Sequence, residues 1–238
     1  MMPKNGWQGV LLDLDGTLLD TIPDLAAAAN AMLQAMGRES LAESKIRTFV
    51  GKGADNLIAR TLAGGLDAPA PEAQIFATAK KHFFDYYRAN NGRFASLYPG
   101  VLEGLQALKE MGLSLAVVTN KPYEFSIPLL EQHGLLSYMA LVVGGDTCER
   151  RKPDAEPILY ACEKIGCPPW ATLTIGDSIN DALAARAAGG AVLAVPYGYN
   201  EGAPVTDLPV DGIVQSILEA VHWLEKNDAK VPQTQVRS

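Results

Sequence analysis

Two carboxylates stand close together near the start of the sequence, where Asp13 and Asp15 are followed by Gly16 and Thr17. They come directly after the apolar run 10–12, a pattern typical of a buried parallel strand. Alternate side chains of an extended chain point the same way, so both carboxylates would face one site. Such a pair is repulsive unless a cation holds it, and Mg2+ prefers oxygen ligands. The pair predicts a cation site, although a turn followed by a helix cap would use the same residues.

Polar side chains also follow three later apolar runs, at or just beyond the point where each run ends. These side chains are Thr119, Lys152, Asp177 and Asp181. The carboxyl ends of parallel strands meet at one edge of a sheet, which is where open α/β sheets bind ligands. A cation and an ammonium can neutralise the oxygens of a phosphoryl group there, while a hydroxyl fixes its orientation. The set therefore indicates a phosphoryl site.

The elements that must position these residues are short apolar runs alternating with helical patterns. The runs cover residues 10–12, 115–118, 141–143, 173–175, 191–195 and, more weakly, 212–214. Gly112 and Gly166 are placed to end two of the helices between them. This alternation predicts an α/β fold with a doubly wound, Rossmann-like parallel sheet and right-handed crossovers.

Residues 20–96 break the alternation, because they show helical patterns and no convincing strand. The expected helices cover residues 25–36, 54–62 and 72–88. An insertion of this length is too long for a crossover, so it predicts a separate α-helical cap above the first strand. The expected boundaries are 1–19 and 97–227 for the core, 20–96 for the cap and 228–238 for a polar tail. The loops near Leu19 and Ser96 join the two parts and are consistent with hinges.

Composition excludes several classes of protein. A net charge of -7 provides no electrostatic surface for nucleic acid or an anionic membrane. No apolar run reaches the roughly 20 residues of a membrane span, and the first residues lack the pattern of a signal peptide. The cysteines Cys148, Cys162 and Cys167 lack paired spacing and fit free thiols in a reducing compartment. We expect a cytoplasmic protein.

Four segments of the chain resemble, in order, the four motifs of the haloacid dehalogenase superfamily. They are residues 12–18, 118–120, 152–154 and 175–181. Each motif is short, but the four together span nearly the whole chain, and each follows or closely trails a strand-like run. Their spacing is typical of members with a helical cap inserted after the first motif.

The resemblance implies a mechanism built on the first motif. Asp13 would attack the substrate phosphorus and form an aspartyl-phosphate, and Asp15 would protonate the leaving alcohol and later deprotonate the attacking water. One Mg2+ would be held by Asp13, by the backbone carbonyl of Asp15 and by Asp177. The superfamily's ion pumps and dehalogenases lack an acid at the position of Asp15, so an aspartate here favours a phosphatase or a phosphomutase.

The later motifs imply supporting roles around the phosphoryl group. Thr119 would donate a hydrogen bond to its oxygens and Lys152 would neutralise them. Asp181 would act indirectly, through water or by orienting its neighbours.

Within the superfamily, the chain resembles the phosphoglycolate phosphatases most. The likeness rests on residues 18–24, 49–53 and 196–200. The chain departs from that group after Lys152-Pro153, where Asp154 stands in place of a histidine. The likeness implies a small phosphorylated metabolite, 2-phosphoglycolate, as substrate. The sequence does not show the oligomeric state, and we expect a monomer or homodimer.

A substrate-binding set is predicted around these motifs: Thr17, Arg47, Gly51, Lys52, Gly53 and Asn120. Gly51 and Gly53 would permit a tight turn whose amides face the site. Arg47 or Lys52 would pair with a substrate carboxylate, or both are solvated surface cations, since charged residues are mostly exposed.

Other functions remain open at this point. A sugar phosphatase, such as one acting on N-acetylmuramic acid 6-phosphate, would use the same core with a differently lined cap. A phosphomutase of the β-phosphoglucomutase type would protect its phosphoenzyme from water. An inactive binding protein on this fold is disfavoured, because no motif residue is missing.

Overall fold

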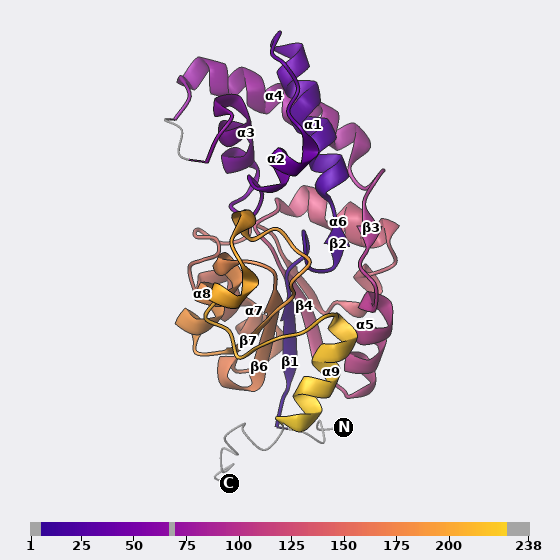
Figure 1. Cartoon of the computed structure of the whole chain (residues 1–238). Coiled ribbons are helices and arrows are strands. Elements are labelled where there is room, and N and C mark those ends of the chain that lie inside the picture. The colour runs from indigo at the N-terminus through magenta and orange to yellow at the C-terminus, as the bar shows by residue number, and fades with distance from the viewer. Residues whose placement is uncertain (1–5, 67–69, 228–238) are drawn as a thin grey trace.

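The computed structural model describes residues 6–66 and 70–227 and has a six-stranded parallel sheet at its centre (Figure 1). The strand order is β5-β4-β1-β6-β7-β8. The strands are β1 (Gly9–Leu12), β4 (Ser114–Val118), β5 (Leu141–Val143), β6 (Thr172–Gly176), β7 (Ala191–Ala194) and β8 (Gly212–Ile213). Every apolar run predicted to be a strand contributes one, and the expected α/β fold is confirmed.

Helices cover both faces of this sheet. They are α5 (Val101–Glu110), α6 (Tyr123–Gln132), α7 (Glu156–Ile165), α8 (Ile179–Ala188) and α9 (Ile217–Lys226). Alternate residues of β1 face opposite sides: Val10 and Leu12 pack with α5, α6 and α9, while Leu11 packs with α7 and α8. Buried on both faces, β1 is apolar throughout, as expected of a central parallel strand.

Short turns of 3-10 helix complete the core. They are η1 (Leu136–Tyr138), η2 (Pro169–Ala171), η3 (Asn200–Gly202) and η4 (Val205–Asp207). Among the described residues, no helix is both long and apolar enough to cross a membrane.

Four helices inserted after the first strand form a layer above the carboxyl edge of the sheet (Figure 1). They are α1 (Ile22–Ala35), α2 (Glu43–Arg47), α3 (Ala54–Ala63) and α4 (Ala73–Asn90). Their apolar faces enclose a second core around Met32, Ile46 and Phe83, which Phe125 of α6 and Tyr199 from the loop after β7 also join. The insertion is therefore a helical cap with its own buried cluster.

The two connections to the cap differ from the expected loops. β2 (Leu19–Asp20) pairs antiparallel with β3 (Ser96–Leu97), so the segments predicted as hinges are hydrogen bonded to each other. Strands of two residues are too short to show a periodic pattern of apolar residues. The helix α2 is also too short to show one, so it was not predicted.

The domain boundaries follow from this pairing. We propose that the chain divides at the β2–β3 pairing, into a core of residues 1–19 and 97–227 and a cap of residues 20–96. The predicted polar tail, 228–238, lies outside the described residues.

Asp24 ties the beginning of the cap to its end. Its buried carboxylate in α1 accepts hydrogen bonds from the backbone amides of Gly92, Phe94 and Ala95, at 3.1, 2.9 and 3.1 Å. A carboxylate with several amide donors is a strong, specific contact. It fixes the start of α1 against the segment that leaves α4.

Close packing of α5 on α9 requires Gly104. A Cβ at this position would lie 2.6 Å from the carbonyl carbon of Ile217 and from the amide nitrogen of Leu218. These are backbone atoms, which cannot rotate away. We expect Gly104→Ala to lower the free energy of unfolding by about 1–2 kcal/mol, because overpacking outweighs the helix propensity gained. Urea denaturation measures this change.

Gly65→Ala provides the control for this prediction. A Cβ there would meet no heavy atom within 4 Å, and the backbone is not left-handed. We expect this variant to be as stable as the parent or slightly more so. Equal stability of the two variants would contradict the close contact of α5 with α9.

Candidate active site

A pocket lies between the carboxyl edge of the sheet and the cap. Eight of the residues predicted from the sequence line it: Asp13, Asp15, Gly51, Gly53, Thr119, Asn120, Lys152 and Asp177. They come from the ends of β1, β4 and β6, from the loop after β5 and from the cap loop before α3. The topology therefore brings together side chains more than 160 positions apart in the sequence.

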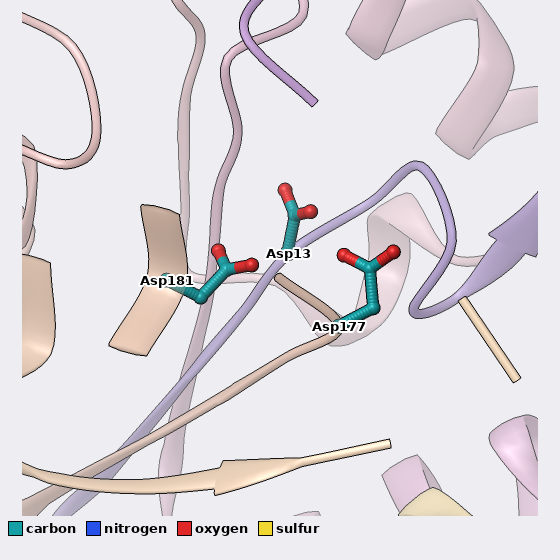
Figure 2. A group of neighbouring side chains, drawn as sticks. All are labelled: Asp13, Asp177 and Asp181. Carbon is teal, nitrogen blue, oxygen red and sulfur yellow. The ribbon is translucent and has the colours of Figure 1, made fainter. Parts of the chain in front are cut away.

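Three carboxylates gather at the base of this pocket. Asp13, Asp177 and Asp181 each offer an oxygen within 4.8 Å of the others, and Figure 2 shows the carboxylates of Asp13 and Asp177 side by side. Burial raises the pKa of Asp13 to about 6, although the Lys152 ammonium opposes the shift. Burial, and then the charges of Asp13 and Asp181, raise the pKa of Asp177 well above its ordinary value. Burial and mutual repulsion therefore both oppose the negative charge of this cluster.

Lys152 compensates part of that charge. Its Nζ donates to Asp13 Oδ1 at 2.9 Å, to Asp181 Oδ1 at 2.6 Å and to the carbonyl of Val118 at 2.6 Å. Only 2% of the side chain is exposed. Burial disfavours the ammonium, but the two carboxylates outweigh it and raise the pKa of Lys152 above its ordinary value. Lys152 is therefore charged, and these three acceptors occupy all of its N–H groups.

Asp181 is engaged through both of its oxygens. Oδ1 accepts from Lys152, and Oδ2 accepts from the amide and the hydroxyl of Ser178, at 3.1 and 2.7 Å, where α8 begins. Asp181 thus holds Lys152 in position from the first turn of a helix. This geometry supports an indirect role better than a direct contact with a metal.

The remaining oxygens suit a divalent cation. Asp13 Oδ1 accepts from Lys152 and Asp177 Oδ2 accepts from the amide of Tyr199 at 2.6 Å. Within the described part of the chain, Asp13 Oδ2 and Asp177 Oδ1 have no hydrogen-bond donor. Two buried, repelling carboxylates with free oxygens match the ligand preference of Mg2+. The donor set fits this ion.

Asp15 has a partner that the sequence did not reveal. Lys121 Nζ lies 3.1 Å from Asp15 Oδ1, and it also donates to the hydroxyl of Tyr87, from cap helix α4. Lys121 directly follows the second motif at the end of β4, so its position there was a readable signal. Tyr87 lies in a helix that is amphipathic for packing reasons, and nothing in the sequence distinguished it.

The structure places Arg47 and Lys52 outside this pocket. Arg47 donates to the carbonyls of Tyr197 and Gly198, at 2.7 and 3.0 Å. Lys52 lies 3.1 Å from Glu201 and is 41% exposed. Both cations attach the cap to the loop that follows β7. The predicted contact with a substrate carboxylate has no support in this arrangement, because Arg47 donates to two carbonyls and Lys52 pairs with Glu201.

Two other predicted substrate contacts, Thr17 and Gly51, have different surroundings. Thr17 is buried and does not line the pocket, and its carbonyl accepts from the hydroxyl of Tyr197. Gly51 reaches the pocket, but its carbonyl accepts from the amide groups of Asn120 and Asn180, at 3.1 and 3.3 Å. The turn around Gly51 therefore docks onto the core through its carbonyl, where an amide pointing into the site was expected.

Replacing Asp177 with asparagine tests the charge balance of the cluster. Because the folded-state pKa of Asp177 is raised, its carboxyl favours the fold below the ordinary pKa and loses that contribution as pH rises through the raised value. We expect Asp177→Asn to raise the melting temperature of the metal-free protein, more at neutral than at acidic pH. Mg2+ should then no longer stabilise the protein, although it stabilises the parent.

Calorimetry with and without Mg2+ measures both effects. Asp207→Asn, in a surface turn, serves as the control and should leave the metal response intact. Equal stabilisation of Asp177→Asn and parent by Mg2+ would exclude Asp177 as a metal ligand.

Comparison with known proteins agrees with this geometry. The family described as haloacid dehalogenase-like hydrolase matches residues 10–195. Phosphoglycolate phosphatases of Thiobacillus denitrificans and Nitrosospira multiformis are 47% and 46% identical, covering 92% of this chain and 96% of their own. A crystal structure described as a predicted phosphoglycolate phosphatase from Haemophilus somnus superposes with a TM-score of 0.86 at 34% identity, covering 92% of this chain and 99% of its own. The chain therefore belongs to the haloacid dehalogenase-like hydrolase family and groups with its phosphatases.

Proposed function

We propose that the protein is a Mg2+-dependent phosphatase that hydrolyses 2-phosphoglycolate to glycolate and phosphate through an aspartyl-phosphate on Asp13. One observation carries the proposal: Asp13, Thr119, Lys152 and Asp177, from separate strand ends and the loop after β5, line one pocket. A carboxylate nucleophile, a hydroxyl, an ammonium and a cation site are the parts that phosphoryl transfer needs.

The metal would be held by Asp13 and Asp177, together with the backbone carbonyl of Asp15. When bound, Mg2+ neutralises phosphoryl oxygens and the carboxylates around it. Asp181 and Lys152 remain paired with each other at 2.6 Å and fix the position of Asp13.

The first half of the reaction forms the phosphoenzyme. A carboxylate oxygen of Asp13 attacks phosphorus and forms an O–P bond, while the P–O bond to glycolate breaks. Asp15 gives its proton to the departing glycolate oxygen, so that oxygen leaves as a hydroxyl and not as an alkoxide. Thr119 is buried and lines the pocket. Its hydroxyl donates to a phosphoryl oxygen.

The second half returns the enzyme to its starting state. Asp15, now a carboxylate, takes a proton from water, and the water oxygen attacks phosphorus. The bond between phosphorus and Asp13 breaks, releasing inorganic phosphate and the free carboxylate. The same carboxyl thus serves as acid and then as base, which conserves protons over one turnover.

Two observations support 2-phosphoglycolate as the ester. The relatives at 46–47% identity are phosphoglycolate phosphatases that match over nearly their whole length. The cap side of the pocket is mostly apolar, with Leu57, Phe83 and Phe84 among its lining residues. Such a wall offers few partners to the hydroxyls of a sugar, whose burial without hydrogen bonds is costly.

The competing reactions are hydrolysis of a sugar phosphate and phosphoryl transfer within a sugar phosphate. Purified protein with Mg2+ should release phosphate from 2-phosphoglycolate far faster than from N-acetylmuramic acid 6-phosphate or glucose phosphates. Faster release from a sugar phosphate would reject the proposed substrate. Isomerised glucose phosphate with little free phosphate would instead identify a mutase.

We also propose that the enzyme is located in the cytoplasm. The three cysteines are free in the structure, which suits a reducing cytoplasm. We propose a monomer or homodimer acting on a small phosphorylated metabolite.

A further inference from the structure

Two ammonium groups line the pocket, and one of them is saturated. The three donors of Lys152 are taken by Asp13, Asp181 and the carbonyl of Val118. Lys121 is just as buried, with 3% of its side chain exposed, and it contacts both oxygens of Asp15, at 3.1 and 3.3 Å, and the hydroxyl of Tyr87. An ammonium has three N–H donors, and one N–H can serve both oxygens of a single carboxylate, so Lys121 has a donor for a further acceptor.

Tyr87 adds a second donor at the same place. Lysine has no acceptor, so the Tyr87 hydroxyl accepts from Lys121 and keeps its own O–H free to donate. Burial raises the pKa of Tyr87 to about 12, although Lys121 opposes the shift, so the hydroxyl keeps its proton at neutral pH. An N–H and an O–H side by side suit the two oxygens of a carboxylate.

The position of this pair matches a short acidic ester. Lys121 Nζ is 3.1 Å from the carboxylate of Asp15, the residue that protonates the ester oxygen in the proposed reaction. A group held by Lys121 therefore lies within two hydrogen-bond lengths, roughly 6 Å, of the Asp15 carboxylate. In 2-phosphoglycolate, a single methylene separates the ester oxygen from the carboxylate.

The described cap residues that line the pocket include no cation. Phe83, Phe84 and Phe125 line the adjacent wall. Arg47 and Lys52 are engaged with the loop after β7, outside the pocket. We infer that Lys121, held by Tyr87 of the cap, is the specificity-determining residue that binds the carboxylate of an acidic phosphate ester.

This inference rests on the proposed function and makes it specific. It also links substrate choice to the cap, because Tyr87 belongs to α4 whereas Lys121 belongs to the core. The carboxylate of the substrate would contact both parts of the protein at once. A neutral ester would leave the Lys121 ammonium and the Tyr87 hydroxyl without that partner.

Matched esters with and without a carboxylate test the inference. The pairs are 2-phosphoglycolate with ethyl phosphate, and 3-phosphoglycerate with glycerol phosphate. The measured quantity is the acid-to-neutral ratio of kcat/KM within each pair. Lys121 also holds Asp15, so Lys121→Met should slow every ester, but only lost recognition changes the ratio.

We expect Lys121→Met to reduce the ratio for the 2-phosphoglycolate pair by roughly 100-fold or more, the size expected for lost hydrogen bonds between charged groups. Tyr87→Phe, which leaves the contact between Lys121 and Asp15 in place, should reduce it by roughly 10-fold. Lys80→Met, on the surface of α4, is the control and should leave the ratio unchanged. Circular dichroism checks that each variant is folded.

The outcomes separate the inference from the proposed function. An unchanged ratio in both Lys121→Met and Tyr87→Phe would overturn the inference while leaving the phosphatase intact. Wild-type protein that prefers 3-phosphoglycerate, and loses that preference in Lys121→Met, would reject the proposed substrate and support the inference. Wild-type protein that releases no phosphate from any of the four esters would overturn the proposed function itself.

Discussion

Replacing Asp13 with asparagine is expected to lower kcat for 2-phosphoglycolate by roughly 1,000-fold or more, since an amide cannot form the phosphoenzyme. The change is nearly isosteric, and Lys152 keeps its contact with Asp181 at 2.6 Å. The fold should therefore persist. Phosphate release in the presence of Mg2+ measures the loss, with circular dichroism as the check on structure.

A matched variant isolates the chemistry of Asp13 from a general loss of acidic charge. Asp55→Asn changes a half-exposed carboxylate that pairs with Lys80 in the cap, and its activity should equal that of the parent. Activity of Asp13→Asn within a small factor of the parent would show that Asp13 is not the nucleophile. Activity of the parent that survives complete chelation of divalent cations would contradict the metal site.

Replacing Asp15 with asparagine is expected to slow esters according to their leaving group. An alkyl ester such as 2-phosphoglycolate needs a proton on its departing oxygen, so its rate of phosphoenzyme formation should fall by roughly 100- to 10,000-fold. An ester of p-nitrophenol leaves readily without a proton and should lose far less in that step. Rapid-quench measurement of the first turnover with both esters gives the comparison.

The control for Asp15 must separate acid catalysis from its contact with Lys121. Asp15→Asn leaves Lys121 bound to Tyr87 but removes the neutralising carboxylate. Asp15→Glu keeps the acid and should recover part of the lost rate. Equal losses on the alkyl and the p-nitrophenyl esters would show that Asp15 supports structure and does not donate the proton.

The sheet and the protein family could be predicted from the sequence, because strand patterns and motifs are formed by residues that are neighbours along the chain. Each parallel strand is buried on both faces, as in Val10, Leu11 and Leu12, and therefore reads as an uninterrupted apolar run. The motif residues stand at the ends of those runs or just beyond them, so the topology alone brings Asp13 and Lys152 together. The enzyme class, a phosphoric monoester hydrolase, followed from these motifs and agrees with the relatives.

The pairing of the two cap connections was not predictable. Leu19–Asp20 and Ser96–Leu97 are far apart in the sequence and too short to show a period. Their contact forms only because the cap returns the chain to the place where it left the core, with Asp24 binding the far segment. A contact between segments so far apart in the sequence leaves no pattern in the residues around either segment.

Which side chains line the pocket was also not predictable from the sequence. Arg47 and Lys52 looked like candidates to bind an anion because they are cations near a glycine-rich turn. In the folded chain their partners are the carbonyl of Tyr197 and the carboxylate of Glu201, about 150 residues away. Tyr87 reaches the pocket from a helix whose periodicity reports only packing. These contacts join cap and core, and sequence spacing does not encode them.

Trapping the phosphoenzyme tests the nucleophile most directly. Protein and Mg2+ are mixed with 2-phosphoglycolate carrying a labelled phosphate, quenched in acid within the first turnover, and digested for mass spectrometry. We expect the label on Asp13, and its absence from Asp13→Asn. A label on any other residue, or phosphate released from 2-phosphoglycolate without a labelled enzyme at any time in the first turnover, would contradict an aspartyl-phosphate at Asp13.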